Sequence, residues 1–276
     1  MSINIHSTSI VDKKAELSDG VEIGPFCVVG PNVKLGPNVK LIAQVNLAGD
    51  TSIGADCKLY PFVSMGHPPQ DFKHKGGDVS IEIGERSVFR ENVNIHPGSD
   101  AGNPITRIGN DCYFMVGTHL AHEGQMGNNV IVSNGAQIGG NVTIGDYAIL
   151  GGLCAIHQHT RIGAHAFVGG MATVTTDIIP YGSVRGNAAY LTGLNVVGLK
   201  RRGFSREKIR DLRSAYRLLF APEGTFAERL DDTAKLYSEH ELVMEIVDFI
   251  KSQKNRSICM PKAGSCLLYT SDAADE

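Results

Sequence analysis

The chain has 276 residues, 42% of them hydrophobic, and a formal net charge of −3. This length and composition suit a globular protein with one large and one smaller domain, and the slight acidity argues against a nucleic-acid-binding protein, which needs a basic surface. The amino terminus has no basic segment followed by an apolar run, and no stretch approaches the roughly 18 apolar residues of a membrane span. We therefore expect a cytoplasmic protein without an integral membrane segment.

A six-residue repeat dominates the first two thirds of the chain. Steps of six from Ile5 to Met65, from Ile83 to Ile95 and from Ile108 to Val174 reach only Ile, Leu, Val, Met or Phe. A helix repeats every 3.6 residues and a strand every 2, so a period of six indicates a short strand plus a turn. Three hexads would make an 18-residue rung, and stacked rungs would form a prism, that is, a parallel β-helix.

Two other positions of the hexad carry small residues. A glycine often follows the aliphatic residue, and we expect this glycine to occupy a corner that needs unusual backbone angles. Another position holds four of the six cysteines, which we expect to be small buried side chains without disulfides or a zinc cage. These are Cys27, Cys57, Cys112 and Cys154.

The repeat is interrupted twice and then ends. Residues 66–82 replace three hexads with proline, glycine and charge, and Ile95 and Ile108 are separated by a spacing that is not a multiple of six. We therefore expect a prism over residues 1–186 with loops at 66–82 and 99–107. Helical patterns with capping residues follow, which predicts a C-terminal α-helical domain over residues 187–255. The tail, residues 256–276, has neither period and is expected to be disordered or derived from cloning.

Four histidines fall within a few rungs of one another. Residues 18 apart share one corner on neighbouring rungs, so His122 should stack on Gly140 and then on Gln158. A single histidine on a prism is usually a solvated surface residue, but a cluster indicates a functional site. The cluster consists of His96, His119, His122 and His157.

Two chemistries are open to this cluster. In the first, His122 is a general base oriented by Glu123, and the Gly140 N–H stabilises an oxyanion, which together suit acyl transfer. In the second, three histidines bind zinc, but the three-residue spacing of His119 and His122 does not match such sites. No nucleophile elbow, P-loop or dinucleotide fingerprint is present, so covalent catalysis is not indicated and we expect no cofactor. Because the histidine spacing does not match a zinc site, we also expect no metal.

Two further segments are candidates for binding. Loop residues Gln70, Asp71 and Lys73 are polar and would lie on a rigid scaffold, where ligands are commonly held; the alternative is an ordinary polar loop. A basic segment between Lys200 and Arg213 is either a solvated helix face or a surface that attracts an acidic protein or a phosphate group.

The chain resembles a known family in the stretches "QDFK", "THLAHE", "AIHQHTRIGAHAFVGG" and "RGNAAYLTGLNVVGLKRRGFSRE". These stretches and the hexads, over about residues 5–255, resemble the UDP-N-acetylglucosamine O-acyltransferases that start lipid A biosynthesis. The resemblance implies a left-handed parallel β-helix and a homotrimer. It also implies transfer of an (R)-3-hydroxyacyl chain from acyl carrier protein to the 3-hydroxyl of UDP-N-acetylglucosamine.

The resemblance also assigns roles to residues. It implies that His122 is the general base, that the Gly140 amide binds the oxyanion, and that Gly170 sets acyl-chain length. The basic segment after Lys200 would meet the acidic carrier protein. The residues implied to hold or line the site for the nucleotide sugar and acyl donor are Gln70, Asp71, Lys73, His96, His119, His157, Gln158, Asn195, Arg201 and Arg202.

Two departures from the family and two rival functions remain. Glu123 stands where the family often has aspartate, and Asn141 stands where many members have histidine. The nearest rival is an N-acyltransferase acting on a 3-amino sugar nucleotide or on a later lipid A intermediate. The other rival is a non-enzymatic hexapeptide scaffold, in which replacing His122 would have no special cost.

Overall fold

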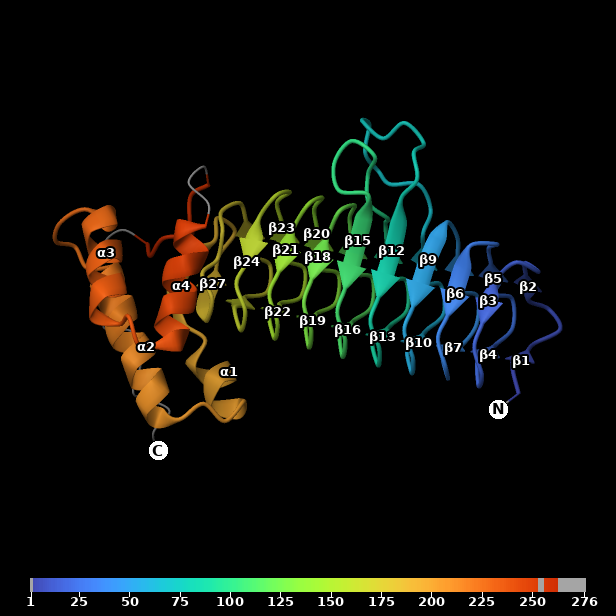
Figure 1. Cartoon of the computed structure of the whole chain (residues 1–276), viewed down its shortest axis with the longest axis horizontal. Helices are drawn as coiled ribbons and strands as arrows, with labels where there is room; N and C mark the ends of the chain where they lie inside the picture. Colours follow the sequence, from blue (N-terminus) through green and yellow to red (C-terminus); the bar gives the residue numbers. More distant parts are fainter. Residues whose placement is uncertain (1, 253–255, 263–276) are drawn as a thin grey trace.

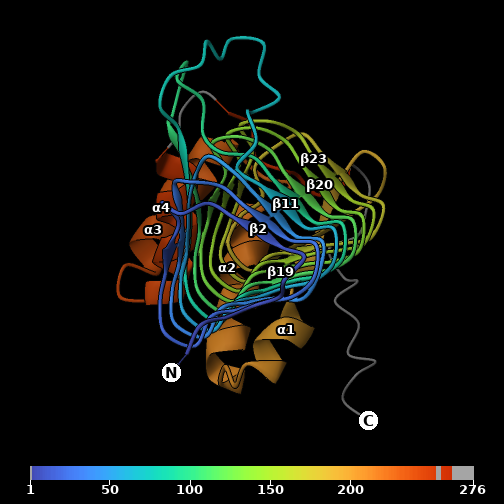
Figure 2. The ribbon, with the colours of Figure 1, turned by 90° about the vertical axis from the view of Figure 1, so that its right-hand side faces the viewer.

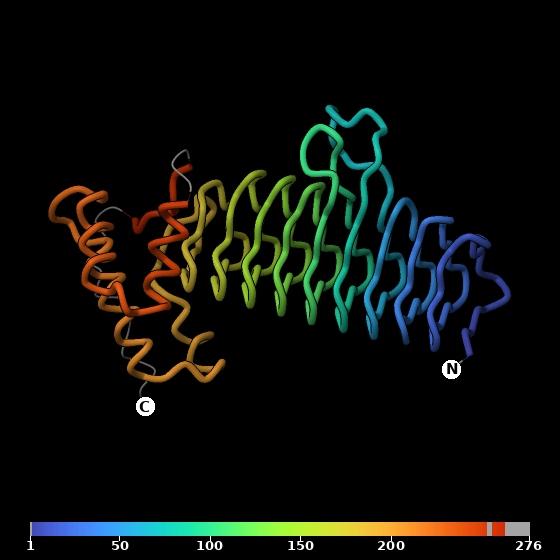
Figure 3. The backbone as a smooth tube through the Cα atoms, viewed as in Figure 1, coloured from blue at the N-terminus to red at the C-terminus, as the bar shows by residue number. Residues whose placement is uncertain are grey.

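The repeat forms a long three-sided prism with helices at its C-terminal end (Figure 1). The computed structural model describes residues 2–252 and 256–262. Each turn of the chain adds one short strand to each of three parallel sheets, and paired residues on neighbouring regular rungs are 18 apart, as in the pair Asn4 and Glu22. The fold is the predicted left-handed parallel β-helix, and the stacked coils are visible in the backbone trace (Figure 3).

The three faces of the prism are called sheets A, B and C. Sheet A contains β1 (Asn4–Ile5), β4 (Glu22–Ile23), β7 (Lys40–Leu41), β10 (Lys58–Leu59), β13 (Val88–Phe89), β16 (Tyr113–Phe114), β19 (Ile131–Val132), β22 (Ile149–Leu150), β25 (Phe167–Val168), β27 (Gly182–Arg185) and β28 (Tyr190–Leu194). Sheet B contains β2 (Ile10–Val11), β5 (Val28–Val29), β8 (Asn46–Leu47), β11 (Ser64–Met65), β14 (Asn94–Ile95), β17 (His119–Leu120), β20 (Gln137–Ile138), β23 (Ala155–Ile156) and β26 (Thr173–Val174). Sheet C contains β3 (Glu16–Leu17), β6 (Val33–Leu35), β9 (Asp50–Ile53), β12 (Ser80–Ile83), β15 (Ile105–Ile108), β18 (Gln125–Met126), β21 (Thr143–Ile144) and β24 (Arg161–Ile162).

The core of the prism is the stack of aliphatic hexad positions. From Ile23 onward every one of them is buried, so from the second rung on the prism is filled by side chains and stabilised by apolar burial. The four cysteines of the repeat are buried and free, as predicted. Burial raises the pKa of the Cys57, Cys112 and Cys154 thiols to about 11, so these thiols are neutral packing groups near neutral pH.

The glycines of the hexads serve a different purpose from the one predicted. Apart from Gly66 (φ 81°) at the start of the first interruption, the glycines that follow the aliphatic residue do not have positive φ angles. Instead, a Cβ atom added at Gly24 would lie 1.8 Å from the Ile42 carbonyl oxygen, and one at Gly163 would lie 2.2 Å from the Pro180 nitrogen. These glycines therefore allow close approach of successive rungs. The left-handed backbone falls two residues later, on residues such as Phe26 (φ 58°).

The corners of the prism are named by the sheets that they join. At the AB corner the chain passes from sheet A to sheet B, at the BC corner from B to C, and at the CA corner from C to A. Both interruptions of the repeat leave the prism at the BC corner, as loop 1 (residues 66–79) and loop 2 (residues 96–104). The two loops project together from one side of the prism (Figure 2). They end earlier than predicted because β12 and β15 begin at Ser80 and Ile105.

The prism ends in an antiparallel strand and four helices. β28 pairs with β27 and closes sheet A, so the helical region begins at Val196 and not at residue 187. The helices are α1 (Val196–Arg201), α2 (Arg206–Leu219), α3 (Phe226–Leu236) and α4 (Glu241–Lys251). Ser205 caps α2, and Thr225 and Glu228 form the predicted capping box of α3. In the described part of the chain, none of these helices is long and apolar enough to span a membrane.

Residues 256–262 pack against the prism, contrary to the disorder expected for the tail. Within residues 256–262, Cys259 is buried and its N–H donates to the carbonyl oxygen of Asp177 at 2.7 Å. The fully buried Asp177 carboxylate accepts hydrogen bonds from Nε of Arg161 at 2.7 Å and Nε of Arg256 at 3.1 Å. The segment therefore fastens the helical region to the last rungs. The remainder of the predicted tail, residues 263–276, lies outside the described residues.

Candidate active site

The BC corner brings together most of the residues predicted for the site. Loop 1 carries Gln70, Asp71 and Lys73, and β17 carries His119 immediately before the corner. Parallel pairing of β14 with β17 places His96 beside the same rung, although the loop hides this register in the sequence. The corner turns themselves hold His122, Glu123, Gly140, His157 and Gln158.

His122 is held by the carboxylate of its neighbour. Nδ1 of His122 lies 3.1 Å from Oε1 of Glu123, and the Glu123 side chain is 7% exposed. Because a carboxylate oxygen accepts, His122 donates from Nδ1, which leaves Nε2 with a free lone pair. Glu123 has a left-handed backbone (φ 65°), which is the regular corner conformation of this prism. The pair has the arrangement of a general base and its orienting group.

Gly140 lies directly against the imidazole of His122. A Cβ atom added at Gly140 would come within 2.6 Å of Nε2 of His122, so any side chain there would collide with the ring. The neighbouring N–H groups of Gly139 and Asn141 donate to carbonyl oxygens of Ile156 and His122. In the described chain the Gly140 N–H donates to no backbone carbonyl. The predicted proximity of the His122 imidazole and the Gly140 backbone is therefore present.

His96 and His119 form a second pair of rings beside the base. Their centroids are 4.9 Å apart in an edge-to-face arrangement. Burial lowers the pKa of His96 to about 4 and also lowers the pKa of His119, so both rings are neutral near pH 7. The Gln70 N–H donates to Nδ1 of His96 at 3.3 Å, and Nδ1 of His119 donates to Oδ1 of Asn94 at 2.8 Å. These two rings suit substrate contact, whereas His122 has the carboxylate partner.

Asp71 reaches the base from loop 1. Its carboxylate accepts from the Ser99 hydroxyl at 2.6 Å and from the Lys73 N–H at 3.0 Å, and these hydrogen bonds lower the pKa of Asp71, with a smaller contribution from the nearby His122. Ligand-type atoms of Asp71, His122 and Glu123 lie within 4.8 Å of one another. Within residues 2–252 and 256–262 this is the one such group, so the three-histidine zinc arrangement is not formed.

Other predicted residues lie at different corners of the same chain. The Asn195 amide caps α1 and donates to the His165 carbonyl oxygen at 3.0 Å, and the Arg202 guanidinium donates to the Tyr147 carbonyl oxygen at 2.7 Å. Tyr147 and His165 belong to the CA corner, and the exposed Arg201 ends α1 next to it. Gly170 lies at the AB corner, where an added Cβ would meet only the backbone of Gly152. One chain therefore does not bring these residues to His122.

Two residues hold the Glu123 carboxylate in a way that the sequence analysis did not predict. Asn141 donates from Nδ2 to Oε2 of Glu123 at 2.9 Å, and the Asn103 N–H donates to the same oxygen at 3.0 Å. The 18-residue spacing of Glu123 and Asn141 was a usable signal for the first contact. The second contact comes from loop 2, whose path the repeat does not specify.

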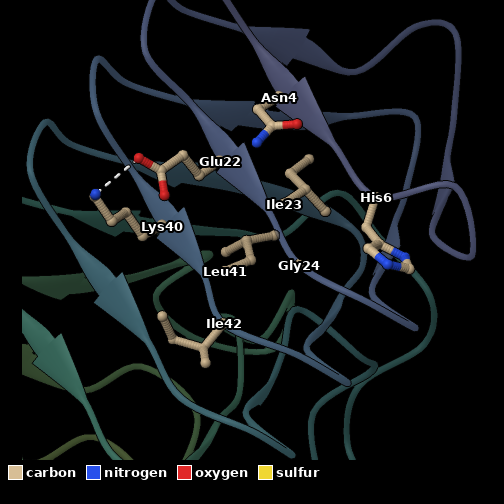
Figure 4. Close-up of a pocket in the computed structure, with 8 residues that line it drawn as sticks. All are labelled: Asn4, His6, Glu22, Ile23, Gly24, Lys40, Leu41 and Ile42. Atoms are coloured by element: carbon tan, nitrogen blue, oxygen red, sulfur yellow. Dashed lines mark hydrogen bonds and ion pairs between the residues drawn. The ribbon is translucent and has the colours of Figure 1, made fainter.

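A depression on sheet A lies near the amino terminus of the prism, several rungs away from His122 (Figure 4). Its acidic and basic groups are paired, because Lys40 donates to Oε1 of Glu22 at 2.7 Å across neighbouring rungs. It has no arrangement of a base with an orienting carboxylate. The residues that line it are Asn4, His6, Glu22, Ile23, Gly24, Lys40, Leu41 and Ile42.

Known proteins share both the sequence and the fold of this chain. The family model described as "Udp N-acetylglucosamine O-acyltransferase; Domain 2" matches residues 177–259. The "Acyl-[acyl-carrier-protein]--UDP-N-acetylglucosamine O-acyltransferase" of Bartonella henselae is 45% identical over 258 residues, 94% of each chain. That of Caulobacter vibrioides is 51% identical over 211 residues, 76% of this chain and 80% of the relative.

Solved structures agree with these relatives. The crystal structure of the UDP-N-acetylglucosamine acyltransferase of Francisella novicida has a TM-score of 0.89 and 32% identity, and covers 95% of this chain and 99% of that one. Another UDP-N-acetylglucosamine acyltransferase structure has a TM-score of 0.90 and 35% identity, covering 94% and 100%. By sequence and by structure, this chain belongs to the family of UDP-N-acetylglucosamine O-acyltransferases.

Proposed function

We propose that the chain transfers an (R)-3-hydroxyacyl group from acyl carrier protein to the 3-hydroxyl of UDP-N-acetylglucosamine, the first step of lipid A biosynthesis. Family membership supports the reaction class. The observation that supports the mechanism is the contact of His122 with both Glu123 and Gly140, because it places a base and an oxyanion donor around one small space.

The proposed reaction proceeds in two steps. The sugar hydroxyl attacks the thioester carbonyl carbon while Nε2 of His122 accepts the hydroxyl proton, and the C–O bond forms as the carbonyl oxygen becomes negative. The Gly140 N–H donates to this oxygen. The intermediate then collapses, the C–S bond breaks, and the His122 imidazolium returns its proton to the thiolate that leaves with the carrier protein. Glu123 stabilises the transient imidazolium charge.

The active assembly is proposed to be a homotrimer. Four apolar residues of the AB corner, Phe26, Phe62, Leu153 and Met171, are 54–71% exposed, which is unusual for such a series of large side chains along one edge. The substrate residues of the CA and AB corners are also separated from His122 within one chain. In a trimer with parallel prisms, the BC corner of one copy would face another corner of its neighbour. This contact would bury the apolar side chains of the AB corner and bring the separated substrate residues to His122 of the neighbouring copy.

The remaining predicted residues are assigned within this assembly. Asp71, Lys73, His119 and Gln158 would bind the nucleotide sugar around the base, while His96 and His157 line the same corner. Arg201 and Arg202 would supply positive charge to the phosphates or the acyl donor. The basic start of α2, with exposed Arg206 and Lys208, would receive the acidic carrier protein in the cytoplasm.

The test is a mass-spectrometric assay of acyl transfer with UDP-N-acetylglucosamine and its 3-amino analogue as acceptors. Replacing His122 by Ala should lower kcat by about 10²–10⁴-fold, the usual contribution of a general base. The matched control is His6→Ala, an exposed histidine near the other end of the prism. Normal turnover by the His122 variant would refute the mechanism, and preference for the amine would favour the N-acyltransferase.

A further inference from the structure

We propose that Asn141 is a positioning residue, which holds the Glu123 carboxylate in the orientation that supports the His122 imidazole. The proposal rests on the proposed function of His122 as base. The contacts form a chain across two rungs: Asn141 Nδ2 to Glu123 Oε2 at 2.9 Å, then Glu123 Oε1 to His122 Nδ1 at 3.1 Å.

The prism places Asn141 for this contact. It lies 18 residues after Glu123, at the same position of the next BC turn, and both residues have left-handed backbones, with φ 56° and 65°. Asparagine is among the side chains that tolerate this conformation best. The backbone N–H of Asn141 also donates to the His122 carbonyl oxygen at 2.8 Å. One residue thus contacts both members of the pair, through its backbone and through its side chain.

Glu123 needs such support because its carboxylate is buried and its side chain is long. Glutamate has one more rotatable bond than aspartate, so it can reach His122 in more ways, and only some of them align Oε1 with Nδ1. A buried carboxylate also needs hydrogen-bond donors. The Asn103 N–H and Asn141 Nδ2 both donate to Oε2, which leaves Oε1 for the imidazole. This arrangement fixes which nitrogen of His122 is available to the substrate.

Other groups around the base do not replace this contact. Asp71 approaches His122 from loop 1, but its oxygens accept from Ser99 and Lys73. His119 lies near His122 on β17, and His96 lies near it at the start of loop 2; burial lowers the pKa of both rings. The carboxylates that lie near His122 are therefore those of Glu123 and Asp71, and the one hydrogen-bonded to Nδ1 is that of Glu123.

The experiment compares Asn141→Ala with a matched control, Asn38→Ala. Asn38 also has a left-handed backbone (φ 60°) and donates from Nδ2 to a carboxylate 18 residues away, Asp56, at 3.0 Å, but it lies near the amino terminus of the prism. Loss of a residue that orients a functional group typically costs about 10–100-fold. We expect kcat to fall about 10-fold in Asn141→Ala, with KM for UDP-N-acetylglucosamine unchanged and the acidic limb of the pH–rate profile moved to lower pH. The control should keep the parent values.

Two further variants separate positioning from direct substrate contact. Asn141→Asp should lose more activity than Asn141→Ala, because it places a second negative charge against Glu123. In a Glu123→Gln background, adding Asn141→Ala should cost little more, since the residue acts through Glu123. The proposal would be overturned if the activity loss of the double variant equalled the product of the losses of the two single variants. A raised KM with normal kcat in Asn141→Ala, or an unchanged pH–rate profile, would overturn it as well. Activity of His122→Ala would instead refute the proposed function itself, so the two failures are distinguishable.

Discussion

The BC and AB corners are built from the same hexads but have opposite characters. The AB corner continues without an inserted loop and exposes apolar side chains such as Leu153 and Met171. The BC corner is interrupted by two loops and carries a buried carboxylate, neutral histidines and a glycine pressed against an imidazole. In the proposed trimer and mechanism, the regular repeat would serve assembly at one corner, and departures from the repeat would supply the chemistry at another.

The substitution with the largest expected effect is Gly140→Ala, which tests whether the BC corner carries the chemistry. The new methyl group would fall within 2.6 Å of Nε2 of His122, so it would displace the ring and cover the amide. Loss of one oxyanion donor alone costs about 10²–10³-fold in kcat, and we expect at least that loss with the thermal midpoint nearly unchanged. The steady-state assay with circular dichroism melting measures both. Activity within tenfold of the parent would contradict the role of Gly140.

At the AB corner the corresponding change is Leu153→Glu, which should act through assembly. The side chain is 66% exposed in the single chain, so the monomer should fold normally. In a trimer the carboxylate would be buried without a partner, at a cost of about 3–5 kcal/mol. We expect light scattering to show dissociation, with activity falling by roughly 10²-fold as a consequence. Leu153→Met is the control and should remain trimeric. If Leu153→Glu were also trimeric and active, the AB corner would not be part of the interface.

Sequence reasoning reached the prism and its central contact because both follow from an 18-residue rung. Once the hexads are in register, His122 must stack beside Gly140. The same reasoning misjudged the glycines, since close rung packing and left-handed φ both select glycine and a sequence does not distinguish them. It also did not locate the Asn103 N–H, because the path of loop 2 depends on tertiary contacts. Nor did it show that Asn195 and Gly170 lie at other corners than His122.

The smallest expected effect, and the most selective, is that of Gly170→Met at the AB corner. A Cβ at this position meets only Gly152, with its carbonyl oxygen at 3.3 Å. The Gly152 backbone must then shift by a few tenths of an ångström, and the larger side chain would project into the space left open by glycine. If this space receives the end of the acyl chain from a neighbouring copy, long chains should lose about 10-fold in kcat/KM, the scale expected for one or two methylene groups. Short chains should react at the parent rate. Competition between carrier proteins loaded with different acyl lengths measures this ratio directly, and an equal effect on all lengths would show that the AB corner contributes to assembly but not to chain selection.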